Sequence, residues 1–175
     1  MIESKNYYRS ISKEIWTQNN ILKKQDIINT NLGECLQDPS KVIMAYISMK
    51  DEVNILPCIK DLSSLQIPYT HKDKIGNCQY SEDLVINNMG FMAPERIIIS
   101  TEEPDIIIIP GRFFDIKGNR IGRGKGFYDR FLTNHLAATF IGISLDQTLI
   151  ELLPNNRDDV KMDIIVTEKE ILNIK

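Results

Sequence analysis

One stretch near the middle of the chain constrains the fold more than any other. It covers residues 105–132 and reads DIIIIPGRFFDIKGNRIGRGKGFYDRFL. After Asp105 come four consecutive isoleucines, Ile106 to Ile109, which end at Pro110-Gly111. A short run of β-branched residues bounded by Pro-Gly predicts a strand that is buried on both faces. Such strands belong to parallel sheets covered by helices, so the stretch favours an α/β fold.

The strand is followed by a segment in which glycines and cations alternate. They are Gly118, Arg120, Gly122, Arg123, Gly124, Lys125 and Gly126. The aromatic segment 127–132 then has the pattern of a helix start. Glycines allow backbone N–H groups to approach phosphate oxygens, and a helix N-terminus adds partial positive charge. The segment therefore predicts an anion-binding loop, although its spacing alone also fits a flexible turn.

Two common phosphate-binding motifs do not fit this loop. A P-loop needs Ser or Thr after Gly-Lys, whereas Gly126 follows Gly124-Lys125 here. The dinucleotide fingerprint G-x-G-x-x-G, started at Gly122, would need a glycine where the chain has Phe127. The sequence therefore supports neither a P-loop nucleotide hydrolase nor a Rossmann dehydrogenase.

Length and composition narrow the class of protein further. A chain of 175 residues is expected to form one domain, residues 1–175. The net charge of −3 creates no general field for nucleic acid. Cys35, Cys58 and Cys78 share no C-x-x-C spacing, which predicts free thiols in a reducing compartment. No apolar run reaches the roughly 18 residues of a membrane span, and the N-terminus has no apolar signal segment. We expect a cytoplasmic monomer that binds a small molecule, without a membrane or nucleic acid partner.

Hydrophobic periodicity predicts helices alternating with strands elsewhere in the chain. One apolar helix face is expected to comprise Tyr8, Ile11, Ile15 and Leu22. A second helix, capped by Asn54, is expected to present Ile55, Ile59, Leu62 and Leu65. Further strands are expected at 41–48, 67–69, 79–81, 138–144 and 162–166. This alternation predicts a mainly parallel sheet covered on both faces.

Three charged residues outside the central stretch are candidates for a ligand site. Lys5 and Arg9 lie one helical turn apart and can reach a common point, although a solvated helix face has the same spacing. Glu52 follows a predicted strand at its carboxyl end, where open α/β sheets bind ligands. An exposed loop glutamate is the alternative. His71 and His135 have no partner at metal-ligand spacing and are expected at the surface.

The segment from Pro110 to Leu132 closely resembles the signature of the 5-formyltetrahydrofolate cyclo-ligases, also called 5,10-methenyltetrahydrofolate synthetases. That signature runs approximately P-G-x-x-F-D-x-x-G-x-R-[LI]-G-x-G-x-G-[YF]-Y-D. The matching residues are Pro110, Gly111, Phe114, Asp115, Gly118, Arg120, Ile121, Gly122, Gly124, Gly126, Phe127, Tyr128 and Asp129. Other family segments resemble Lys5 with Arg9, residues 47–53, 141–143, Asp146-Gln147, Leu153-Pro154, Asp159 and residues 163–167. The resemblance therefore spans nearly the whole chain.

This resemblance implies a single three-layer α/β/α domain with a mostly parallel sheet. It implies an ATP- and Mg²⁺-dependent conversion of 5-formyltetrahydrofolate to 5,10-methenyltetrahydrofolate in one-carbon metabolism, with release of ADP and phosphate. In the family mechanism the formyl oxygen attacks the γ-phosphorus of ATP, and N10 then closes the ring with loss of phosphate. A catalytically weakened homologue that binds folate or nucleotide is the alternative. A sugar-phosphate isomerase-like enzyme is less favoured, because it would leave Lys5, Arg9 and Asp129 without a shared task.

The resemblance also implies roles for individual residues. Arg120, Arg123 and Lys125 would be catalytic, because phosphoryl transfer depends mainly on positioning and charge neutralisation. ATP would contact Lys5, Arg9, Arg120, Gly122, Arg123, Gly124, Lys125, Gly126, Phe127 and Tyr128. Folate would contact Ile47, Glu52, Arg123, Phe127 and Tyr128, with core packing as the alternative for Phe127. Asp129 and Asp159 match the metal-binding aspartates of the family, and their hard oxygens suit Mg²⁺.

Several positions depart from the family pattern. Ala93-Pro94 stands where Glu-Pro is common, and Glu95 follows it. Arg112-Phe113 places a bulky pair where small or apolar residues are usual. The remaining departures are Ile55 for Thr, Asn156 for Glu and Asp158 for His. None of these changes removes a proposed phosphate or metal contact.

Overall fold

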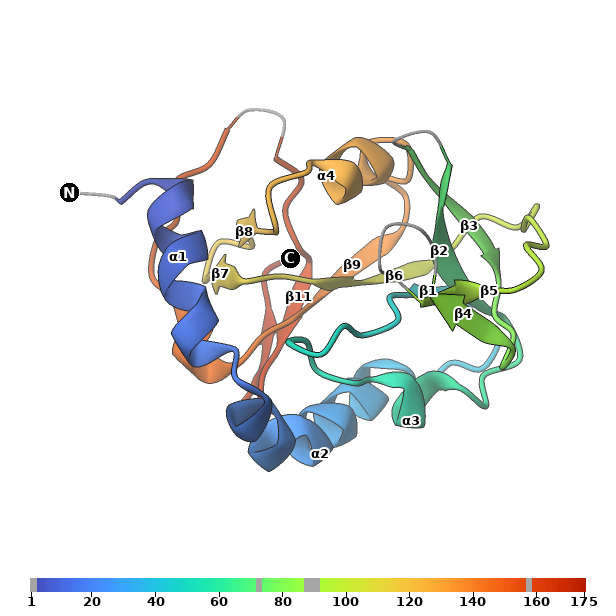
Figure 1. Ribbon diagram of the computed structural model, residues 1–175, viewed down its shortest axis with the longest axis horizontal. Coiled ribbons are helices and arrows are strands. Elements are labelled where there is room, and N and C mark those ends of the chain that lie inside the picture. Colours follow the sequence, from blue (N-terminus) through green and yellow to red (C-terminus); the bar gives the residue numbers. More distant parts are fainter. Residues whose placement is uncertain (1–2, 72–73, 87–91, 157–158) are drawn as a thin grey trace.

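A seven-stranded sheet forms the centre of the computed structural model, which describes residues 3–71, 74–86, 92–156 and 159–175 (Figure 1). The strand order is β12-β11-β9-β6-β1-β2-β3. In chain order these strands are β1 (Ile43–Ala45), β2 (Leu65–His71), β3 (Lys74–Gln79), β6 (Ile106–Pro110), β9 (Thr139–Ile143), β11 (Ile164–Val166) and β12 (Ile171–Asn173). Strands β11, β9, β6, β1 and β2 run parallel, and the edge strands β12 and β3 are antiparallel to their neighbours. The predicted α/β class with a mostly parallel sheet is confirmed.

The isoleucine run forms β6 in the middle of this sheet. Successive side chains of a strand point to opposite faces. Ile108 packs in one hydrophobic cluster, whereas Ile107 and Ile109 pack in the other. All three side chains are at most 1% exposed. The prediction of a strand buried on both faces is therefore confirmed.

Helices cover both faces of the sheet. They are α1 (Lys5–Ile15), α2 (Gln18–Cys35), α3 (Leu56–Ile59) and α4 (Phe127–Leu132), with a 3₁₀ turn η1 at Asp146–Thr148. Figure 1 shows α2 and α3 below the sheet, where Ile28 and Ile59 join the cluster of Ile108. It shows α4 above the sheet, where Leu132 joins the second cluster. No helix in the described parts of the chain is long and apolar enough to cross a membrane.

The first predicted helix is in fact two helices. Thr17 starts α2, because its hydroxyl accepts a hydrogen bond from the Asn20 amide at 3.4 Å. Before this break, Tyr8 and Ile11 pack against the small cluster around Phe113, as expected for one apolar face. After it, Leu22 is 61% exposed, so its assignment to the same face is wrong. Because a new helix begins at this N-cap, residues before and after it do not share one apolar face, and a single periodic pattern cannot describe both helices.

The helix predicted after Asn54 is a short turn. The Asn54 side chain accepts a hydrogen bond from the Leu56 amide at 3.1 Å, but the N-cap residue of α3 is Ile55, so the predicted cap at Asn54 is wrong by one residue. In addition, α3 ends at Ile59, and Leu65 starts β2 instead of extending an apolar helix face. Leu65 pairs with Ile43 of β1, so its burial comes from the sheet. The strand predicted at 67–69 is confirmed within β2.

The central glycine-rich segment contains strands that were not predicted. Its first part forms β7 (Phe113–Asp115) and β8 (Arg120–Ile121), which are antiparallel, and β10 (Leu149–Ile150) pairs with β7. A separate antiparallel pair consists of β4 (Leu84–Ile86) and β5 (Met92–Pro94). We call residues 110–121 the hairpin and residues 122–126 the glycine loop. The glycine loop connects β8 to α4, which spans the predicted helix.

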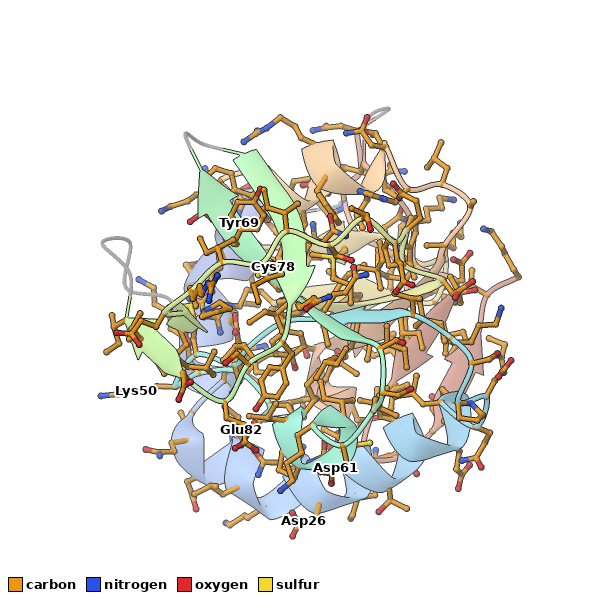
Figure 2. All side chains as sticks on the ribbon, turned by 90° about the vertical axis from the view of Figure 1, so that its right-hand side faces the viewer. Asp26, Lys50, Asp61, Tyr69, Cys78 and Glu82 are labelled. Atoms are coloured by element: carbon orange, nitrogen blue, oxygen red, sulfur yellow. The ribbon has the colours of Figure 1, made fainter. Side chains whose placement is uncertain are left out.

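All three cysteines are free thiols, as predicted. Cys78 lies on β3, and Figure 2 shows it with Tyr69 on the β2–β3 side of the molecule. Its side chain is fully buried, and its Sγ donates to the Ile67 carbonyl at 3.4 Å. Burial raises the pKa of this thiol to about 11. Cys78 is therefore a packing residue with little thiolate at neutral pH.

Candidate active site

A cavity of about 370 Å³ opens at the carboxyl ends of β1 and β6. This is the edge at which open α/β sheets bind ligands. The cavity is lined by every residue that the sequence predicted for the site: Lys5, Arg9, Ile47, Glu52, Arg120, Gly122, Arg123, Gly124, Lys125, Gly126, Phe127, Tyr128, Asp129 and Asp159. Its apolar lining includes Tyr46, Met49, Pro68, Ile75 and Met92. The fold thus joins residues as far apart in sequence as Lys5 and Asp159.

The hairpin sets the point from which the glycine loop departs. Asp115 is fully buried at its turn, where its carboxylate accepts hydrogen bonds from the amides of Lys117, Asn119 and Leu153, each at 2.9 Å. The Asn119 side chain donates a further bond at 2.8 Å. Gly118 closes the turn with a φ of 83°, which favours glycine. These bonds fix the hairpin to the segment that contains Leu153.

The glycine loop differs from the buried turn of the hairpin because the central residues of the loop are exposed. Gly124 has a φ of 96°, and the Arg9 side chain lies beside it. Arg9 Nε donates a hydrogen bond to the Gly122 carbonyl at 3.0 Å, which ties α1 to the loop. α4 follows the loop directly but has only six residues, so its dipole is small. Anion binding here would therefore depend on the loop and its cations.

Arg120 is a buried cation of the site. Its side chain is 4% exposed, and its Nη2 lies 2.9 Å from Asp129 Oδ1. Its Nη1 donates to the Pro110 carbonyl at 3.3 Å, and its guanidinium carbon lies 5.6 Å from the centre of the Tyr128 ring. That last contact is a cation–π interaction. Arg120 therefore holds Asp129 and Tyr128 in the cavity wall.

Helix α1 contributes two cations from one face, as their spacing predicted. Lys5 pairs with the carboxylate of Asp159, and Arg9 reaches the glycine loop. Asp159 also accepts a hydrogen bond from the Asn156 amide at 2.6 Å. Because both cations line the cavity, the alternative of a purely solvated helix face does not hold.

Arg123 joins the glycine loop to the segment after β1. Its Nη2 pairs with the Asp51 carboxylate, and its Nε donates to Glu52 Oε1 at 3.1 Å. Burial alone would lower the pKa of Arg123, but Asp51 and Glu52 raise it above its usual value. Burial would raise the pKa of Asp51, but hydrogen bonds from Arg123 and Arg112 lower it. Arg123 is thus held as a cation between two carboxylates.

Glu52 faces inward and is not an exposed loop residue. Its side chain is 10% exposed, and its Oε2 accepts a hydrogen bond from the Met49 amide at 2.9 Å. The intervening Lys50 is exposed and points away from the molecule (Figure 2). Burial, and then the Glu52 carboxylate, raise the pKa of the Tyr46 and Tyr128 hydroxyls. Glu52 therefore has two neutral hydroxyl groups as neighbours at physiological pH.

Phe127 lies among cations. Its ring is half-buried and lines the cavity. Lys125 Nζ lies 5.7 Å from the ring centre, and the Arg130 guanidinium carbon lies 5.4 Å from it. These contacts place the ring at the cavity rather than in a hydrophobic core, which argues against the core-packing alternative.

Asp129 and Asp159 are the candidate metal ligands, and both line the cavity. Within the described residues, no group of three His, Cys, Asp or Glu side chains could hold a metal ion by itself. Two carboxylates nevertheless fit Mg²⁺, which commonly binds one or two carboxylates together with substrate phosphates and water. His135 lies apart from them, partly exposed and 2.7 Å from the exposed Glu103, as expected for a surface residue that binds no metal. The side chain of His71 lies outside the described part of the chain.

The positions that depart from the family pattern have different surroundings. Arg112 lines the cavity, whereas Phe113 is buried with its ring centre 5.1 Å from that of Tyr8. Ala93 is buried, and the exposed Glu95 lies outside the cavity lining. Ile55 is buried in the core, Asn156 lines the cavity, and Asp158 lies outside the described residues.

Sequence reasoning assigned no role to Asp51 or to Tyr46. Asp51 pairs with Arg123 and Arg112, and the Tyr46 hydroxyl donates to the Val53 carbonyl at 2.8 Å. Both residues lie within or next to residues 47–53, which resemble a family loop. That proximity to Glu52 was the available signal, but Arg112 and Arg123, the partners of Asp51, come from another part of the chain.

The comparisons with known proteins agree with this geometry. The sequence model of the 5-formyltetrahydrofolate cyclo-ligase family matches residues 5–168. The 5-formyltetrahydrofolate cyclo-ligase of Haemophilus influenzae is 30% identical over 158 residues, covering 82% of this chain and 84% of that protein. The Escherichia coli K12 enzyme of the same name is 28% identical over 143 residues, covering 74% and 79%. The solved structure of Aquifex aeolicus 5,10-methenyltetrahydrofolate synthetase has a TM-score of 0.84 and 25% identity, covering 98% of this chain and 93% of that one. The chain therefore belongs to the 5-formyltetrahydrofolate cyclo-ligase family.

Proposed function

We propose that this protein converts 5-formyltetrahydrofolate to 5,10-methenyltetrahydrofolate in an ATP- and Mg²⁺-dependent reaction that releases ADP and phosphate. The observation that carries the proposal is the meeting of all the predicted site residues on one cavity, in a chain of this family. That cavity has a cationic side, formed by α1 and the glycine loop, and an apolar side, formed by the sheet edge.

The cationic side suits a triphosphate. Lys5, Arg9, Arg123 and Lys125 all reach the cavity, and Arg120 lies in its wall. Phosphoryl transfer needs charge neutralisation and alignment of the reacting oxygens. Several of these cations already have protein partners, such as Asp159 for Lys5 and Asp51 for Arg123. Phosphate oxygens would therefore exchange with carboxylates at sites arranged for anions.

The apolar side suits a pterin. Ile47, Pro68, Ile75 and Met92 offer flat or flexible apolar contacts. Glu52 lies among them with little exposure, and its carboxylate can accept hydrogen bonds from pterin N–H groups. Ligand sites commonly combine apolar walls with a few polar groups that fix orientation. Glu52 is the group that we assign to that task.

Asp129 and Asp159 would hold Mg²⁺. When bound, the ion would neutralise charge on the phosphate oxygens. Arg120 keeps Asp129 at the wall of the cavity, through the 2.9 Å ion pair between their side chains. Lys5 and the Asn156 amide hold Asp159. Both aspartates line the same cavity.

In the proposed reaction the formyl oxygen attacks the γ-phosphorus of ATP, and ADP leaves. N10 then attacks the formyl carbon, the bond from that carbon to the phosphorylated oxygen breaks, and phosphate leaves with the N10 proton. Arg123 and Lys125 would stabilise negative charge that develops on the transferred group. Glu52 and the apolar wall would hold the pterin so that N10 faces the formyl carbon.

The test is a product assay with purified protein, ATP, MgCl₂ and 5-formyltetrahydrofolate. We expect the absorbance of 5,10-methenyltetrahydrofolate to rise, and to remain flat when ATP is omitted or EDTA is added. A flat trace with all components present would refute the proposal. Tight binding of either substrate by calorimetry without product would instead support a catalytically weakened binding protein.

A further inference from the structure

Arg112 is a buried cation whose position is fixed by its own backbone. The residue is 7% exposed. Its amide donates to the Ile121 carbonyl at 2.7 Å, and its carbonyl accepts from Trp16 Nε1 at 2.8 Å. Its guanidinium carbon lies 5.9 Å from the centre of the Trp16 ring. The backbone of Arg112 is thus held by Ile121 of β8 and by Trp16, the residue that follows α1.

The head of the side chain is directed at one residue. Arg112 Nη1 donates to the Asp51 carbonyl at 3.0 Å, and Nη2 pairs with the Asp51 carboxylate. A guanidinium that contacts two groups of one residue restricts that residue far more than a single contact would. Asp51 is therefore held at both its backbone and its side chain.

Asp51 in turn contacts the glycine loop. One carboxylate oxygen pairs with Arg112 and the other with Arg123. A movement of Asp51 toward solvent would leave the buried Arg112 charge without its partner, which is costly. The buried cation consequently restrains the exposed one through the carboxylate between them.

We propose that Arg112 is a positioning residue, which holds Asp51 so that Asp51 and Glu52 direct the Arg123 guanidinium into the cavity. This role deepens the proposed function, on which its kinetic consequence rests. The competing explanation is that Arg112 only stabilises the packing around Trp16. The two explanations differ in whether Arg112 acts through Asp51.

The experiment is a double-mutant cycle with Arg112→Met, Asp51→Asn and the double variant. Met keeps much of the apolar volume of the Arg stem. Lys41→Met is the matched control, since Lys41 also pairs with an aspartate, Asp105, at 3.3 Å, but outside the cavity lining. Two experiments are performed: the product assay gives kcat and KM, and hydrogen exchange without added ligand gives the exchange rates of the amides of residues 122–126.

We expect each single variant to lower kcat by between about 10-fold and about 100-fold, because a misplaced catalytic group costs rate. Each should also speed exchange in the glycine loop. The double variant should lose no more than the larger single effect, since both substitutions break one connection. Lys41→Met should change neither the kinetic constants nor the exchange rates.

Multiplying losses in the double variant, or unchanged loop exchange in Arg112→Met, would overturn the positioning role. If Arg112→Met does not fold, Asp51→Asn alone must still speed loop exchange, and normal exchange in it overturns the role. An inactive wild-type protein would refute the proposed function, whereas the exchange measurement would still decide the role of Arg112.

Discussion

The hairpin and the glycine loop are neighbours within one sequence signature, yet their surroundings are opposite. In the hairpin, Phe114 and Asp115 have no exposed surface. In the glycine loop, Arg123, Gly124 and Lys125 are all exposed. The hairpin is closed by backbone hydrogen bonds and by the Asp115 carboxylate, whereas side chains from α1 and from residues 51–52 hold the loop.

This difference divides the signature into residues that build the site and residues that face it. Phe114 packs against Gly111 and Gly142, where an added Cβ would collide with its ring. Gly111 is therefore required for packing, although it also lines the cavity. A signature shared by a family is therefore more than a set of ligand contacts, because buried residues such as Phe114 and Asp115 support those that line the cavity.

The largest effect is expected from Asp115→Ala in the hairpin. The substitution removes an acceptor for four hydrogen bonds and leaves buried amides without partners. We expect the free energy of unfolding to fall by about 3–5 kcal/mol, as measured by urea denaturation. Asp115→Asn, which keeps one acceptor oxygen, should lose less. Equal stability of the alanine variant and the wild type would contradict the assignment of the hairpin as the rigid base.

The second largest effect is expected from Arg123→Ala in the glycine loop. This substitution should leave the free energy of unfolding unchanged and lower the turnover number. Loss of a cation at the transferred phosphate should lower turnover by about 100-fold or more. Lys117→Ala is the matched control, because it removes an exposed cation from the hairpin that does not line the cavity. The control should keep wild-type turnover. Wild-type turnover in Arg123→Ala would place the phosphates elsewhere.

Much of the fold was predictable because local pattern and final burial agree. The run Ile106–Ile109 forms a central strand, since both of its faces meet hydrophobic clusters. The hairpin was missed because its first strand, β7, is also held by residues far along the chain, namely β10 and the Leu153 amide. The exposed Leu22 was misassigned because the Thr17 cap interrupts a periodicity that looks continuous. Errors arose where side-chain hydrogen bonds or strand pairing decided the backbone path, as at Asp115 and at Leu65.

The site was predictable to a different degree. Its residues could be named because residues 110–132 resemble a long family signature and shorter segments elsewhere resemble other parts of the family, and all the named residues line the cavity. Their partners could not be named. Nothing in the sequence indicates that Arg112 pairs with Asp51, or that Asp51 also holds Arg123, because these contacts depend on how β1 and β6 meet. The sequence pattern identifies which side chains belong to the site, whereas the ion pairs between them can be assigned only from the tertiary structure.

A smaller effect compares two glycines, one in each region. Gly118 and Gly124 both have positive φ, at 83° and 96°. A Cβ at Gly118 would lie 2.5 Å from the Met162 carbonyl oxygen, whereas a Cβ at Gly124 would lie 3.3 Å from the movable Arg9 side chain. Gly118→Ala should destabilise the protein by about 2 kcal/mol and Gly124→Ala by about 1 kcal/mol. Only Gly124→Ala should raise KM for ATP. If Gly124→Ala lost more stability than Gly118→Ala, the assignment of the hairpin as the more rigid of the two regions would be contradicted.

The smallest effect concerns the pH dependence of stability at the junction of the two regions. The pKa of Asp51 lies below its ordinary value of 3.8, because the hydrogen bonds from Arg123 and Arg112 outweigh the effect of burial. A depressed folded-state pKa adds stability above the unfolded-state value, and that stability is lost as pH falls through the folded-state pKa.

The free energy of unfolding of wild type should therefore exceed that of Asp51→Asn by a constant amount at neutral pH. The gap should narrow below pH 3.8. Solvent screening keeps it small, since the Asp51 side chain is 41% exposed. Urea denaturation of both proteins across this range measures the gap, and a gap that widens in acid would show that the two arginines do not favour the ionised carboxylate.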